Sequence, residues 1–123
     1  DSGLDKAEAQ LKEKKYMQAL ETLAGVLQRH PGNADALTAI GYAYQQLGET
    51  DKASSYFDKA LQSDPQHLGA NEHRASLYIQ SGDLARAMEQ LQVIRMICSG
   101  IECAELIYLE AEMNAFKKDA KED

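Results

Sequence analysis

Tryptophan is absent from this chain of 123 residues, which also has only 2 prolines and 2 cysteines. No apolar run approaches the roughly 18 residues that a membrane-spanning helix needs, so we expect no membrane insertion. Basic residues are also scarce: 13 Lys and Arg stand against 20 Asp and Glu, which gives a net charge of -7. This balance disfavours nucleic acids and anionic membrane surfaces as partners.

Motifs that carry catalysis or metal binding are missing as well. The sequence has no glycine-rich phosphate loop, no HExxH pair and no calcium-binding loop. Its three histidines, His30, His67 and His73, have no partnered nucleophile or base that the pattern identifies. We therefore predict no enzymatic activity, no cofactor and no metal site.

The informative stretch covers residues 34–67, where apolar and small residues recur at helical spacing. Gly48 interrupts the pattern and Pro65 ends it, so the stretch predicts two amphipathic helices joined by a tight turn. The two apolar faces comprise Leu37, Ile40, Gly41 and Tyr44, followed by Ala53, Phe57 and Ala60.

The same features return 34 residues earlier and 34 residues later. The earlier copy has Ala19, Leu23, Val26 and Pro31, and the later copy has Tyr78, Gly82, Ala87, Leu91 and Ile94. A period of this length at small, aromatic and turn positions indicates stacked helical hairpins, because one hairpin cannot bury both of its apolar faces alone.

On these residues the chain resembles the tetratricopeptide repeat (TPR) family, whose 34-residue pattern the central copy matches. The third copy departs from it with Asn71 in the tryptophan slot, and the first with Gly3 and Lys6. The resemblance implies an all-α, right-handed α-solenoid in a single domain, 1–123. Its repeats would cover about 1–33, 34–67 and 68–100, before a capping helix at about 102–118 and a frayed tail. Expected helices are 1–12, 16–29, 34–47, 51–62, 67–80 and 84–98.

The resemblance also implies a function, namely a non-catalytic adaptor or scaffold that binds a partner peptide or helix in the concave groove. Family ligand-facing positions correspond to Thr38, Tyr42, Gln45 and Gln46 in the second repeat and to Glu72, His73, Ser76, Ile79 and Gln80 in the third. Tyrosine is a common interface anchor, and amides can bond a peptide backbone. The alternative is that Tyr42 packs on a neighbour and the amides are simply solvated.

A different function also fits the sequence. The first repeat departs most from the family pattern, so Leu4 and Leu11 would be exposed and would stack on another copy, forming a homo-oligomer through terminal repeats.

Cys98 and Cys103 flank a glycine-containing turn between two predicted antiparallel helices. That placement can bring their Cα atoms within the roughly 4.4–6.8 Å that a disulfide requires. A bond there would indicate an oxidising compartment, periplasmic or extracellular. The alternative is a pair of reduced thiols in the cytoplasm.

Overall fold

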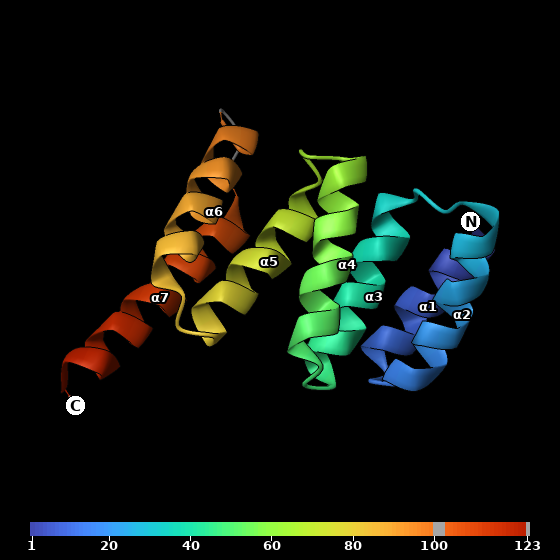
Figure 1. Cartoon of the computed structure of the whole chain (residues 1–123), viewed down its shortest axis with the longest axis horizontal. Helices are drawn as coiled ribbons and strands as arrows, with labels where there is room; N and C mark the ends of the chain where they lie inside the picture. Colours follow the sequence, from blue (N-terminus) through green and yellow to red (C-terminus); the bar gives the residue numbers. More distant parts are fainter. Residues whose placement is uncertain (100–102, 123) are drawn as a thin grey trace. The chain divides into compact units, whose positions relative to one another are not determined.

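The computed structural model describes residues 1–99 and 103–122, with side chains described as far as residue 119. Over these residues it contains seven helices, in three helix–turn–helix pairs followed by a last helix (Figure 1). They are α1 (Ser2–Lys12), α2 (Tyr16–Arg29), α3 (Ala34–Gln46), α4 (Thr50–Ser63), α5 (Leu68–Gln80), α6 (Leu84–Ile97) and α7 (Ala104–Glu122). The expected all-helical, paired organisation is confirmed, and the first six helices end within one residue of the predicted bounds.

The seventh helix differs from its prediction. Its expected start at residue 102 lies outside the described residues, and its backbone stays helical to Glu122, through most of the tail predicted to be frayed. The physical reason is that the segment after Ala104 contains no glycine or proline and is rich in alanine, lysine and glutamate, which favour helix.

Side-chain caps mark where α3 and α5 begin. The Asn33 side chain accepts a hydrogen bond from the Ala36 amide at 3.0 Å, which satisfies a free donor in the first turn of α3. His67 occupies the same slot one repeat later, and its Nδ1 accepts a hydrogen bond from the Ala70 amide at 3.0 Å. The other ring nitrogen lies 2.5 Å from a carboxylate oxygen of Asp35, which orients the imidazole.

The turns within the pairs share one unusual backbone conformation. Gly48 and Gly82 have φ angles of +79° and +78°, in the left-handed region that commonly follows the end of a helix. Lys14 occupies the equivalent slot of the first repeat with φ at 62°. A lysine therefore adopts a conformation that glycine adopts at lower cost.

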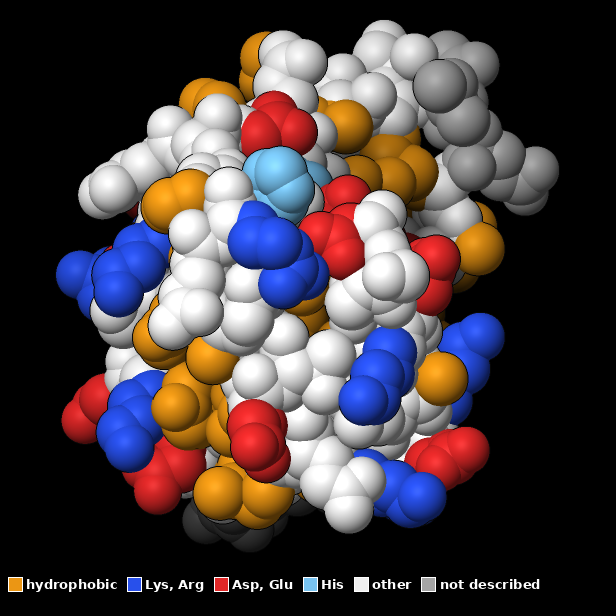
Figure 2. Space-filling view, turned by 90° about the vertical axis from the view of Figure 1, so that its right-hand side faces the viewer, with side chains coloured by type: hydrophobic (Ala, Val, Ile, Leu, Met, Phe, Trp, Pro, Cys, Tyr) orange, Lys and Arg blue, Asp and Glu red, His pale blue; other side chains and the backbone are white. Residues whose placement is uncertain are grey.

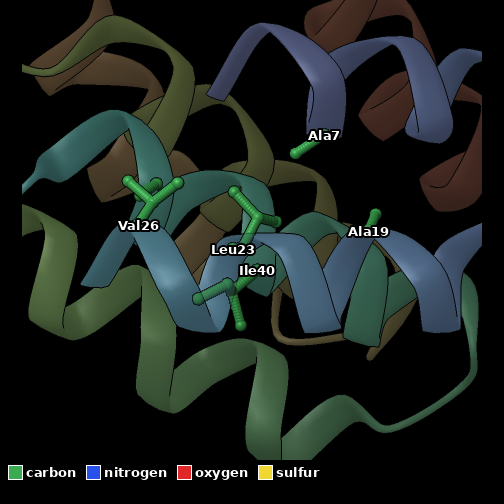
Figure 3. Close-up of a cluster of buried hydrophobic side chains, with 6 residues drawn as sticks. Ala7, Ala19, Leu23, Val26 and Ile40 are labelled. Carbon is green, nitrogen blue, oxygen red and sulfur yellow. The ribbon is translucent and has the colours of Figure 1, made fainter. Parts of the chain in front are cut away.

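The chain forms two compact units, Asp1–Ala70 and Asn71–Asp123, so the boundary falls within α5. One core cluster of the first unit joins α1, α2 and α3, and Figure 3 shows its side chains between these helices. Its buried members are Ala7, Ala19, Leu23, Val26, Ala36 and Ile40.

Leu4 and Leu11, which were expected to be exposed, are instead half-buried and pack against this core. Figure 2 shows side chains of both charges together with several hydrophobic ones on this side of the molecule. Lys6, Glu21 and Arg29 line one cavity of the α1–α2 pair. Half-burial reduces the apolar surface that Leu4 and Leu11 offer to another copy, and self-assembly through the terminal repeats stays a prediction.

A close approach between α3 and α4 explains the glycine inside a helix. A Cβ atom at Gly41 would lie 2.5 Å from Cε1 of the Phe57 ring, far below a permitted contact. The first repeat has Ala7 and Leu23 in the two equivalent slots, and both are fully buried. The second repeat thus combines a larger side chain, Phe57, with a smaller residue, Gly41, at the facing position.

The second unit contains a polar pair in its interior. Asn71, in the slot where the family pattern has tryptophan, is 1% exposed, and Gln90 is 8% exposed. The Gln90 amide donates a hydrogen bond to the Asn71 side-chain oxygen at 2.5 Å. Pairing of the two amides offsets the cost of removing them from water.

Two links hold α7 to α6 within this unit. Cys98 and Cys103 form a disulfide with a Cα–Cα distance of 6.0 Å, so the predicted bond is present in the structure. Further along, the Arg95 guanidinium lies 3.0 Å from a Glu110 carboxylate oxygen. The last helix is therefore attached both covalently and by an ion pair.

Candidate ligand-facing surfaces of α3 and α5

Three of the four predicted α3 residues lie where a ligand can reach them. Tyr42 and Gln45 are half-buried, and Gln46 is exposed. Thr38 is different, because it is only 7% exposed and its hydroxyl donates to the Ala34 carbonyl at 2.7 Å. The accessible α3 set is therefore Tyr42, Gln45 and Gln46.

On α5 the structure corrects one prediction. Ile79 is 1% exposed and is among the largest fully buried side chains, so the expectation that it faces a ligand is wrong. Glu72, His73 and Ser76 are half-buried, and Gln80 is exposed, with its amide donating to the Ser76 hydroxyl at 3.5 Å. The accessible α5 set is Glu72, His73, Ser76 and Gln80.

Carboxylates from α7 lie near the α5 set. Burial, and secondarily the charge of Glu105, raise the pKa of Glu72 above its ordinary value of 4.5. The same two causes, burial first, raise the pKa of Glu112. Glu105 and Glu112 are seven residues apart, so they share one face of α7. That spacing is what the sequence shows of these two glutamates, and it does not indicate that their face of α7 lies close to Glu72.

Other kinds of site can be addressed for residues 1–99 and 103–122. In this part of the chain, no three His, Cys, Asp or Glu side chains are arranged to hold a metal ion. Nor is any described helix both long and apolar enough to cross a membrane.

Comparison with known proteins identifies the repeat. A tetratricopeptide repeat model matches residues 4–67 and again residues 38–96, which together cover most of the chain. The chain belongs to the tetratricopeptide repeat family. Its Gly48 and Gly82 turns and its Gly41–Phe57 contact are thus features of TPR hairpins in this protein.

Relatives match this TPR chain over part of their length. It is 35% identical over 72 residues to the Protein CTR9 homolog of Arabidopsis thaliana, a match that covers 58% of this chain and 6% of that protein. A second match, to an FK506-binding protein-like of Mus musculus, is 34% identical over 59% of this chain and 22% of that protein. The chain thus spans less than a quarter of either relative.

Solved structures of similar fold cover nearly the whole chain. One is the Yersinia enterocolitica type III secretion chaperone SycD in complex with a peptide of the translocator YopD, with a TM-score of 0.81 and 18% identity over 97% of this chain and 92% of that one. Another is PcrH in complex with the chaperone binding region of PopD, with a TM-score of 0.81 and 18% identity over 99% and 92%. At these identities the likeness establishes the fold.

Proposed function

We propose that this TPR protein is a non-catalytic protein-binding module, an adaptor or scaffold, that holds a peptide or helix of a partner on its ligand-facing residues. The observation that carries the proposal is that Tyr42, Gln45 and Gln46 of α3 remain accessible at the positions that the family uses for ligands. The SycD and PcrH structures, each solved with a peptide from a partner protein, support this class of ligand.

The α3 residues suit an extended or helical peptide. Tyr42 offers a flat, partly apolar ring that loses little conformational entropy when it is covered. Gln46 supplies an amide with both donors and an acceptor, which can pair with main-chain groups of a ligand. The side-chain oxygen of Gln45 is buried, so Gln45 contributes contact surface rather than an acceptor. This combination gives affinity without demanding one particular ligand sequence.

The α5 and α7 residues favour a cationic ligand there. Glu72 lies within the electrostatic influence of Glu105, and burial already disfavours the ionised form of Glu72. A lysine or arginine of the partner would relieve that repulsion, whereas an acidic segment would increase it. We therefore propose that a partner segment bound at these α5 and α7 residues of the second unit has basic character.

Capture from native extract tests the proposal. The full chain is immobilised beside Tyr42→Ala/Gln46→Ala and a matched control, Tyr108→Ala/Gln92→Ala, which removes the same side chains from exposed positions on α7 and α6. We expect one partner to be retained by the wild type and the control and lost by the α3 variant. Equal capture by all three proteins would overturn the assignment of the surface.

Folding of each variant is verified by circular dichroism, since Tyr42 is half-buried. If the double variant does not fold, Gln46→Arg replaces it, because this exposed position admits a bulky charge without disturbing the core. Retention of the partner by a folded Gln46→Arg protein would then count against the α3 surface.

We further propose that the protein works in an oxidising compartment, periplasmic or extracellular. The Cys98–Cys103 bond supports this, because such bonds persist mainly outside the reducing cytoplasm. Intact mass after alkylation of the native protein before cell lysis provides the test. Two alkylated thiols would place the working protein in the cytoplasm instead.

A further inference from the structure

A second accessible surface lies in the first unit, between α2 and the α3–α4 pair. It is a cavity of about 400 Å³ whose lining is mostly aliphatic and aromatic. The principal lining residues are Leu20, Ala24, Leu27, Ile40, Tyr44 and Tyr56, here called the α2–α4 groove. None of them belongs to the ligand-facing set of α3 or α5, so this surface is separate from the proposed peptide site.

The groove is built on the core of the unit. Ile40 is part of that core and is labelled in Figure 3, while Leu20, Leu27, Tyr44 and Tyr56 pack against it and stay half-buried. Their outer surfaces therefore remain apolar and open to solvent on a rigid base. A volume of this size accepts a leucine or phenylalanine side chain from a ligand.

Two lysines border the aromatic wall. The Tyr44 and Tyr56 rings stack with centroids 5.7 Å apart. The Lys52 ammonium lies 5.3 Å from the Tyr44 centroid, and that of Lys59 lies 4.5 Å from the Tyr56 centroid. Cation–π contact thus places each ammonium group against the ring of a tyrosine that lines the groove, while neither lysine lines the groove itself. Positive charge is thus fixed beside an apolar cavity, in a chain whose net charge is -7.

Comparison among the repeats shows that the fold does not require an apolar wall at these positions. The slots of Ile40, Tyr44 and Tyr56 hold Lys6, Gln10 and Thr22 in the first repeat, and Arg74, Tyr78 and Gln90 in the third. Both of those sets also line cavities, with polar and charged walls. The apolar wall with two lysines is therefore a property of the second repeat.

We propose that the α2–α4 groove binds a partner segment that inserts an aliphatic or aromatic side chain and places carboxylates beside Lys52 and Lys59. The apolar cavity selects the anchor, and the paired cations select acidic flanks. The ligand class is the opposite of the one favoured at α5, so the protein can hold two partner segments of opposite charge on different surfaces.

The test uses a fluorescein-labelled amphipathic peptide of about 14 residues, four helical turns, with leucines and a phenylalanine on one face and glutamates beside them. One twin peptide has lysine for every glutamate, and another has alanine for every anchor. Anisotropy measures affinity for the full chain, and ¹⁵N–¹H spectra locate the contact. We expect a Kd of about 10–100 μM for the acidic peptide, weakening as salt rises, and no binding of either twin.

Variants connect that binding to the groove. Lys52→Glu/Lys59→Glu and, separately, Ala24→Glu should each weaken binding at least about tenfold. Ala24 is exposed, so its substitution leaves the core intact. The matched controls are Lys6→Glu/Lys12→Glu and Ala9→Glu on exposed positions of α1, which should bind as the wild type does.

Three outcomes would overturn the proposal. The first is equal affinity for the lysine twin. The second is spectral change confined to the ligand-facing residues of α3 and α5. The third is groove signals that shift with protein concentration when no peptide is present, which would make a second copy of the chain the occupant. The first and third outcomes leave capture by Tyr42 and Gln46 untouched, and the second would place the peptide on the ligand-facing residues instead. Failure here and failure of the proposed function are therefore distinguishable.

Discussion

Lys14 is the one described residue other than glycine with a positive φ angle. The left-handed region costs an L-residue with a Cβ roughly 1–2 kcal/mol, and the other two repeats place Gly48 and Gly82 in this slot. Part of the gain from introducing glycine is lost to the greater entropy of the unfolded chain.

We therefore predict that Lys14→Gly raises the free energy of unfolding by about 0.5–1 kcal/mol, measured by urea denaturation. The comparison is Lys6→Gly, at an exposed position in the interior of α1, where glycine should lower stability by about 1 kcal/mol. A loss of stability in Lys14→Gly equal to that in Lys6→Gly would show that the turn favours lysine.

Residue-level predictions held where the cause was local. The Asn33 cap depends on a side chain and an amide only three residues away, so the local sequence is enough to indicate it. The burial of Ile79 depends on residues distant in sequence, so the family position alone misplaced it. The cap by His67 also depends on Asp35, 32 residues away, and no local rule indicates it.

At the scale of the elements, the contact between α3 and α4 can be tested by giving the second repeat the residues that the first repeat has at the equivalent positions. Gly41→Ala should destabilise the protein by about 1–3 kcal/mol despite the better helix propensity of alanine, because the new methyl group meets the Phe57 ring. Chemical denaturation of the purified variant provides the measurement.

The double variant Gly41→Ala/Phe57→Leu recreates the pairing of Ala7 with Leu23. We expect its loss of stability to be smaller than the sum of the two single losses, with a coupling of about 1 kcal/mol or more. Additive losses would mean that Gly41 serves some purpose other than admitting the Phe57 ring.

The helix bounds were predictable because the proline and glycine positions agreed with the 34-residue repeat. Pro31, Gly48, Pro65 and Gly82 mark helix ends, and the 34-residue period repeats the assignment three times. The end of α7 was not predictable in this way, since no proline or glycine follows to mark it. A polar composition alone does not separate a frayed tail from a solvated helix.

At the scale of the whole molecule, the excess of acidic residues has an identifiable cost. Glu72 and Glu112 have pKa values raised by burial and by Glu105, so the folded state binds protons more readily than the unfolded chain. Their ionisation therefore opposes folding. The penalty is absent below the ordinary value of 4.5 and grows as the pH rises through the elevated pKa.

We predict that Glu72→Gln raises the melting temperature at pH 7 and that this advantage disappears as the pH is lowered to about 4, where the wild-type carboxyl is protonated in either state. Glu8→Gln on exposed α1 makes the same change in net charge and should show no such dependence. Scanning calorimetry of both variants at the two pH values measures the melting temperatures. A gain from Glu72→Gln that persists at pH 4 would contradict ionisation of Glu72 as its cause.

The sequence predicted the helical architecture of the repeats, but not that Glu72 lies close enough to Glu105 of α7 for their charges to interact. That proximity depends on how α7 packs in its unit, and periodicity assigns faces to helices without assigning neighbours. The α2–α4 groove was missed for a related reason. Its lining residues read as packing positions, and only their half-burial reveals a surface open to solvent.

Both cysteines of the chain are joined to each other, so the oxidised protein presents no reactive thiol. A single cysteine introduced at the exposed Gln46 would be the only position that a maleimide dye can modify under non-reducing conditions. The native bond therefore makes this protein suitable for site-specific labelling without first removing its own cysteines. A fluorophore attached there would sit beside Tyr42 and would report arrival of a partner as a change in colour or intensity.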